Sequence, residues 1–192
     1  KTTDQDNKPV TCSALIVYPL LKRIKNVMLI NHGTHIGFML VPTKYTSVEG
    51  IMAATGSLCI MPDYIGLGSS AKHPDLYLNH EVHGRTSVDA LLTLLDYAQA
   101  KKLPLESNYK TYILGYSQGG STALAFQKYL ETKATDADRK LVNLQGSLCG
   151  AGPYDLGLAI DIYEQMPTMS YPALIPYVLQ GLYSCYSNTL MK

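Results

Sequence analysis

The chain has 192 residues, which is the length of one ordinary domain. Hydrophobic residues make up 46% of it and charged residues 16%, which excludes an intrinsically disordered protein because the apolar side chains suffice for a core. The net charge is +1 and the Lys and Arg residues are scattered, so the sequence does not indicate a nucleic-acid partner.

Short apolar runs bounded by glycine or proline predict the strands of a sheet. Four of the five runs are nearly continuous, which fits strands that are covered on both faces, as in a parallel sheet. The polar lead-in KTTDQDNKP precedes the first of them, and we expect it to be loose. The predicted strands are residues 13–19, 26–33, 56–68, 110–117 and 141–152.

Helical patterns lie between these strands. An apolar stripe begins at Val88, and Thr86 with Asp89 three residues later fits a capping box at its start. A second helix is predicted over residues 118–132, and the polar stretch 132–140 is predicted to be a surface turn. This alternation of strands and helices indicates an α/β fold with right-handed crossovers.

The C-terminal part has a different character, because residues 165–191 contain no charged side chain and are rich in Tyr and Pro. A membrane span needs about 20 predominantly apolar residues. The prolines, Gln180 and Asn188 argue against one here. We expect instead a buried or lid-forming helix over residues 173–190.

The motif G-x-S-x-G occurs in the stretch LGYSQGG, where Ser117 lies between Gly115 and Gly119. A strand that turns at once into a helix needs small residues beside the serine, so that helix and strand can approach. Because a predicted strand precedes the motif and a predicted helix follows it, we interpret Ser117 as the nucleophile of an elbow. The alternative is a glycine-rich turn with an inert serine.

Acyl transfer also needs N–H groups directed at the developing oxyanion. The backbone N–H of Gln118, next to the serine, is the first candidate. The loop NHGTHIG, residues 31–37, follows an earlier strand, and the backbone N–H of Thr34 or a near neighbour is the second. The alternative is a simple turn in which His32 packs structurally.

Three stretches carry a resemblance to the α/β-hydrolase superfamily: NHGT, MPDYIGLGSS and GYSQGG, each after a predicted strand. The sequence resembles bacterial secreted esterases and lipases, and the PDYIGLG stretch also resembles the prolyl-oligopeptidase-like branch. The resemblance implies a mostly parallel sheet flanked by helices, with the N-terminal part of the core in residues 1–155 and the start of a helical lid in residues 156–192. Asp63 is then expected to hydrogen-bond within its loop rather than to act in catalysis. The resemblance also implies a secreted, periplasmic or cell-surface protein.

The catalytic triad of this superfamily runs Ser, then acid, then His along the chain. All five histidines precede Ser117. The aspartates that follow it are Asp136, Asp138, Asp155 and Asp161, and Asp155, which follows a strand, is the best placed acid candidate. We therefore expect the chain to be truncated before the last strands of the sheet, with the C-terminal part that carries the base missing. Alternatives are a non-catalytic relative, or an unusual base such as His32 or His35.

The predicted function is hydrolysis of apolar or lipid-like carboxylic esters through an acyl-enzyme on Ser117. These 192 residues alone should be nearly inactive without the triad His. A peptidase, an acyltransferase or a pseudo-hydrolase that only binds ligands remains open. No cofactor and no metal is predicted. The four cysteines form no CxxC pair, which argues against a zinc site. The uncharged lid suggests association with a membrane surface.

Overall fold

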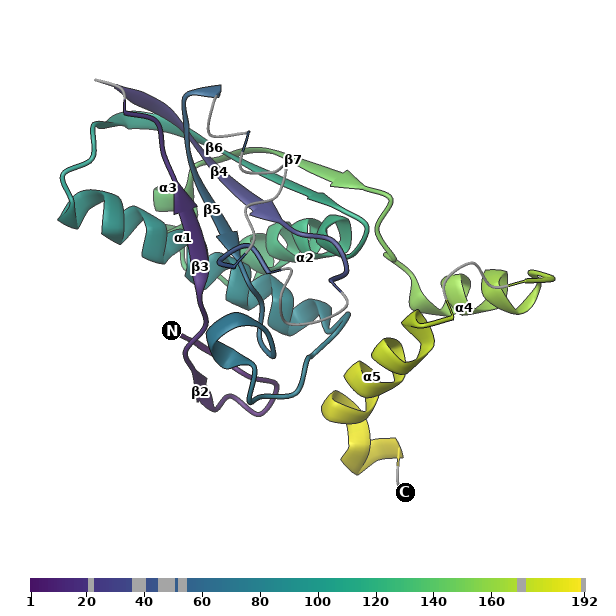
Figure 1. Ribbon diagram of the computed structural model, residues 1–192. Helices are drawn as coiled ribbons and strands as arrows, with labels where there is room; N and C mark the ends of the chain where they lie inside the picture. Colours follow the sequence, from purple (N-terminus) through teal and green to yellow (C-terminus); the bar gives the residue numbers. More distant parts are fainter. Residues whose placement is uncertain (21–22, 36–40, 45–50, 52–54, 169–171, 191–192) are drawn as a thin grey trace.

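The computed structural model describes residues 1–20, 23–35, 41–44, 51, 55–168 and 172–190, and it has a sheet with helices packed against it (Figure 1). Within the described residues, the main sheet has the strand order β3-β5-β4-β6-β7. Strands β5, β4, β6 and β7 run parallel, and β3 pairs antiparallel with β5 at one edge, so the predicted mostly parallel sheet is confirmed. The strands are β3 (Ala14–Val17), β4 (Ile24–Asn31), β5 (Ser57–Pro62), β6 (Leu105–Tyr116) and β7 (Leu144–Gly150).

Helices α1 (His80–Ala100) and α2 (Gln118–Thr132) form the main core with the sheet. Alternation along the strands explains this core, because every second side chain points to the same face. Ile113 of β6 is fully buried there with Leu91 of α1 and Phe126 of α2. On the opposite face of the sheet, a smaller buried cluster contains Ile30, Cys59 and Met61.

Helix α1 begins at His80, so the capping box expected at Thr86 and Asp89 is wrong. The N-cap is Asn79, whose side chain accepts a hydrogen bond of 3.0 Å from the N–H of Val82. The first two turns of α1 are rich in polar residues, so apolar periodicity does not predict them.

Two further local predictions are also wrong. The expected surface turn at residues 132–140 contains helix α3 (Asp136–Val142), which is closed by a capping box between Thr135 and Asp138. The N-terminal lead-in is not loose, since β1 (Thr2–Thr3) and β2 (Pro9–Val10) form a small antiparallel sheet. Arg85 of α1 fastens it by donating to the carbonyl oxygens of Thr3 and Asp4, at 3.0 and 2.6 Å.

The C-terminal segment lies to one side of the core and contains α4 (Leu156–Glu164) and α5 (Leu174–Leu190) (Figure 1). Helix α5 begins within one residue of the predicted start and ends where it was expected. No residue of α4 is buried. Across the described helices, none combines the length and apolar character that crossing a membrane would require.

Candidate active site

Ser117 lies in the turn that joins β6 to α2, and its backbone adopts φ 57° and ψ −124°. A positive φ with this ψ is strained for a residue with a side chain, and such strain persists only where the surrounding structure enforces it. One restraint is the Ser117 N–H, which donates to the carbonyl oxygen of Gly150 at the end of β7 (2.9 Å). The strand–turn–helix arrangement expected around this serine is therefore present.

The glycines around Ser117 are required by close backbone contacts. A Cβ on Gly115 would overlap the carbonyl oxygen of Gly119, and a Cβ on Gly119 would overlap that of Asn31. Gly120 is as tightly placed against the carbonyl oxygen of Gly150. The predicted steric role of these glycines is confirmed.

Gln118 is the first residue of α2, and its backbone N–H finds no acceptor among the described residues. The first N–H groups of a helix lack intrahelical partners and lie at the positive end of its dipole. Gln118 is buried, and its backbone carbonyl oxygen accepts hydrogen bonds from the hydroxyl groups of Ser121 and Thr122. This leaves an N–H beside Ser117 that is suited to an anion.

The loop after β4 approaches the same turn, since a Cβ on Gly33 would be 3.4 Å from the carbonyl oxygen of Tyr116 and 3.9 Å from Ser117 Cβ. The buried ring of His32 lies with Nδ1 2.7 Å from the carbonyl oxygen of Gly33. Because the peptide unit is planar and trans, this hydrogen bond turns the N–H of Thr34 to the opposite side. The peptide between Gly33 and Thr34 is therefore held by His32 in a loop that lies next to the Ser117 turn.

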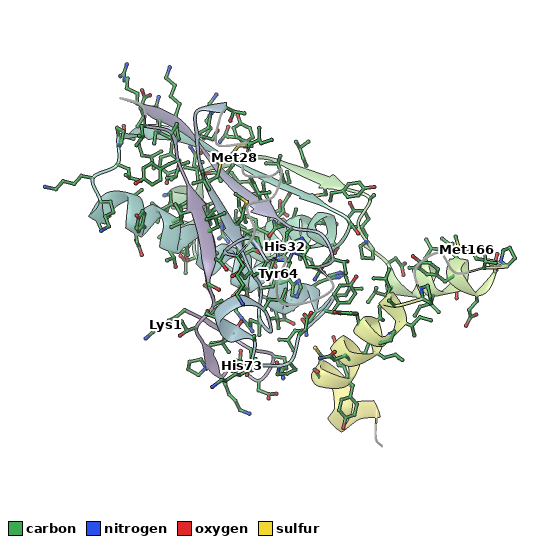
Figure 2. All side chains as sticks on the ribbon, in the orientation of Figure 1. Lys1, Met28, His32, Tyr64, His73 and Met166 are labelled. Atoms are coloured by element: carbon green, nitrogen blue, oxygen red, sulfur yellow. The ribbon has the colours of Figure 1, made fainter. Side chains whose placement is uncertain are left out.

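His32 is held in place by Tyr64, and Figure 2 shows the two side chains next to one another below the strand ends. Their rings stack with centroids 4.0 Å apart, and the Tyr64 hydroxyl donates to the carbonyl oxygen of His32 at 3.0 Å. This role of Tyr64 is not predictable from local sequence, because the contact joins residues 32 apart along the chain.

Burial, with a smaller contribution from His35, lowers the pKa of His32 to about 4. The ring is thus neutral at pH 7 and carries one proton, which the short contact to Gly33 assigns to Nδ1. Its Nε2 is 3.4 Å from the carbonyl oxygen of Asp63. His32 therefore has a structural packing role, which was the alternative interpretation of this histidine. Its hydrogen bond to Gly33 also shapes the loop.

A second buried histidine, His83, lies on the other side of Tyr64, with ring centroids 4.8 Å apart. Its Nδ1 is 3.2 Å from Thr122 Oγ1, and burial lowers its pKa to about 3. Ser117 Oγ makes no hydrogen bond to any side chain in the described part of the chain, so no described histidine is brought into contact with it as a base.

The acid candidates lie apart from this turn or have other partners. Asp155 is exposed and caps α4, its Oδ1 accepting from the N–H of Leu158 at 3.0 Å. Asp136 and Asp138 belong to α3, which leads into the N-terminal end of β7, whereas Ser117 lies at the C-terminal end of β6.

Asp63 is fully buried and has hydrogen-bond partners, as expected, but these belong to other segments of the chain and not to its own loop. Its carboxylate accepts from the hydroxyl of Ser13 (2.6 Å), the backbone N–H of Thr43 (3.1 Å) and the hydroxyl of Thr43. This network fixes the segment that also carries Tyr64.

A cavity of about 650 Å³ opens at the C-terminal ends of β4, β6 and β7; it is lined by Gly115 and Tyr116, which precede Ser117, but not by Ser117 itself. Its volume is within the range of small-molecule sites. It extends from the loop at Gly33 and Thr34 to the exposed side chains of Tyr116 and Leu148. In the part of the chain that the structure describes, no group of three or more His, Cys, Asp or Glu residues is arranged to hold a metal ion.

No family model matches the sequence, and no curated protein matches it either. Solved structures do match. A Legionella pneumophila protein designated a hydrolase has 22% identity and a TM-score of 0.81, with 98% of this chain and 50% of that chain covered. The rice cell wall degrading esterase LipA from Xanthomonas oryzae has 24% identity and a TM-score of 0.81, with 97% and 51% covered.

Candida antarctica lipase A also matches, with 17% identity and a TM-score of 0.71 over 97% of this chain and 43% of the lipase. The chain thus spans about half the length of the solved structures it matches. The structural likeness covers nearly all of this chain. It therefore has the α/β-hydrolase fold that its sequence motifs implied.

Proposed function

We propose that the protein is a serine hydrolase that cleaves carboxylic esters through an acyl-enzyme on Ser117. The observation that carries the proposal is the strained backbone of Ser117, at φ 57° and ψ −124°, between a strand and a helix whose first N–H is unpaired among the described residues. The likeness of the fold to an esterase and a lipase supports the same chemistry.

In the proposed reaction, Ser117 Oγ attacks the ester carbonyl carbon while a base takes its proton. The N–H groups of Gln118 and Thr34 stabilise the resulting oxyanion. The bond to the alcohol breaks, the proton passes to the departing alcohol, and water later releases the acid from Ser117. We assign the base to sequence outside these 192 residues, because no described histidine contacts Ser117.

We further propose an apolar substrate, for which the cavity and the C-terminal helices are the support. Ile30, Leu114 and Leu148 contribute apolar side chains to this cavity. Helix α4 exposes Leu158, Ile160 and Ile162 to solvent. A cap of this kind can cover an acyl chain or rest on a lipid surface, and ester cleavage at such a surface fits a secreted or cell-surface protein.

The test is covalent labelling of the full-length protein with a fluorophosphonate, followed by mass spectrometry of the peptide that contains residue 117. Labelling should occur at Ser117, disappear in Ser117→Ala and persist in Ser107→Ala, which alters an exposed serine of the same strand. A folded protein that takes no label is a binding protein and not a hydrolase. A labelled protein that cleaves peptide anilides but not p-nitrophenyl esters is a peptidase.

A further inference from the structure

Helix α5 is fastened to the loop of residues 74–79 at three points. A Cβ on Gly181 would overlap the carbonyl oxygen of Tyr77, so the helix backbone lies directly against that loop. The ring of Tyr177 meets the ring of Tyr77 edge-on, with centroids 5.9 Å apart. Nearer the C-terminus, Cys185 Sγ accepts from Asn79 Nδ2 at 2.9 Å.

The same loop is tied to the candidate oxyanion loop through two hydroxyl groups. The Tyr77 hydroxyl lies 2.7 Å from Thr34 Oγ1, although the residues are 43 positions apart. Tyr77 is almost buried, and burial raises the pKa of its hydroxyl, so the group stays protonated at neutral pH. The contact is thus a part-buried hydrogen bond between two neutral hydroxyls.

The peptide that carries the Thr34 N–H is therefore held on two sides. His32 Nδ1 holds the Gly33 carbonyl, and Tyr77 holds the Thr34 side chain. An N–H stabilises an oxyanion only from a narrow range of positions, so a small displacement of this peptide weakens the donor.

We propose that Tyr77 is a positioning residue that couples the placement of α5 to the orientation of the Thr34 N–H. This inference rests on the proposed function, because it gives the N–H of Thr34 its part in the reaction. When α5 is seated, Tyr77 holds Thr34 in place; when α5 moves away, the Tyr77 ring loses its support and Thr34 is released. The cap helix would then adjust the catalytic rate as well as cover the site.

The test is a double-mutant cycle in the full-length protein with a p-nitrophenyl ester. Tyr77→Phe and Thr34→Val each remove one hydroxyl and keep the backbone N–H. Each should lower kcat about tenfold with KM unchanged, since the oxyanion contact forms mainly in the transition state. The double variant should lose no more than either single variant, because the two hydroxyls make one contact.

Helix α5 is tested with Gly181→Ala, whose methyl group is directed at the Tyr77 carbonyl. It should lower kcat in the wild type and have little further effect in Tyr77→Phe. The matched control is Tyr183→Phe, an exposed position of the same helix, which should leave kcat unchanged. Fluorophosphonate titration counts folded active sites, so that loss of folded protein is not read as loss of rate.

Additive effects of Tyr77→Phe and Thr34→Val, or an equal effect of Gly181→Ala in both backgrounds, would overturn the inference and leave the proposed function standing. If turnover is absent or survives Ser117→Ala, the proposed function fails. The coupling is then judged by the backbone amide resonance of Thr34. That resonance should shift in Tyr77→Phe and Gly181→Ala but not in Tyr183→Phe, and an unmoved resonance refutes the coupling.

Discussion

The backbones of Gly115 and Gly119 are in direct contact, with the Cα of Gly115 against the carbonyl group of Gly119. The contact joins the end of β6 to the first turn of α2, on either side of Ser117. It brings strand and helix so close that the residue between them is forced into a left-handed backbone. The positive φ of Ser117 and the absence of a side chain at residues 115 and 119 are therefore parts of one geometry.

The first prediction concerns this contact. Gly115→Ala should lower the free energy of unfolding by about 1–3 kcal/mol, because an added methyl group in a tight contact displaces the backbone. It should also abolish fluorophosphonate labelling of Ser117. Urea unfolding and labelling measure the two effects. Gly157→Ala is the control, since a Cβ there would be 3.4 Å from Asp155 Oδ1, an ordinary contact on an exposed helix. Equal stability of Gly115→Ala and the wild type would contradict the proposed constraint.

The second prediction compares two replacements of Ser117. Ser117→Gly should be more stable than Ser117→Ala by about 1 kcal/mol, because glycine adopts φ 57° without the strain that a Cβ imposes. Neither variant should react with a fluorophosphonate. The measurement is the urea midpoint of unfolding of the two variants. Because both variants lack the hydroxyl group, its loss does not contribute to the difference between them. If alanine were as stable as glycine, the backbone of Ser117 would not be strained.

The third prediction concerns Asp63. Asp63→Asn should destabilise the protein by about 1–3 kcal/mol, since an amide places N–H donors where the hydroxyls of Ser13 and Thr43 need an acceptor. Thermal unfolding monitored by circular dichroism tests this. Asp96→Asn changes an exposed carboxylate of α1 and should have almost no effect. If Asp63→Asn were as stable as the wild type, the buried hydrogen-bond network would contribute little to stability.

The parts of the fold that were predictable from sequence are those encoded by neighbouring residues. Helix α2 was placed at residues 118–132, because its glycine motif and apolar residues follow each other directly. The start of α1 was missed, because its first two turns are polar and make contacts with distant residues that apolar periodicity does not reveal. Ser87, for example, is fully buried and donates to Asn31 Oδ1 at 3.1 Å, a contact that leaves no mark on local periodicity.

The same distinction applies to the candidate site. Ser117 and the two N–H candidates stand in short motifs, and the structure brings their loops together as expected. Tyr64 and Tyr77, which fix the loop that carries Thr34, were not found. Each contacts a residue more than 30 positions away in the chain, and neither belongs to a pattern that local spacing can reveal.

The fourth prediction is that His32 and His83 contribute a loss of stability as the pH is lowered from 6.5 towards 4, which is opposed by Asp75, because burial raises the pKa of that carboxyl to about 6. His32 and His83 are buried and neutral, with pKa values of about 4 and about 3, below the ordinary 6.5. Between pH 6.5 and these values the unfolded chain binds protons that the folded protein does not, so acid favours unfolding. His32 alone should cost on the order of 3 kcal/mol when its folded pKa is reached.

Urea unfolding at pH 7.5, 6.5, 5.5 and 4.5 measures this slope in the wild type and in His32→Asn. Asparagine can place an N–H close to the position of Nδ1 and keep the hydrogen bond to Gly33, but it does not titrate. The variant should be less stable at pH 7.5, because its side chain no longer stacks on Tyr64. Its stability should nevertheless fall less steeply with acid than that of the wild type, whereas His73→Asn, at an exposed position, should keep the wild-type slope. Equal slopes for His32→Asn and the wild type would show that His32 is not a buried neutral ring in the folded protein.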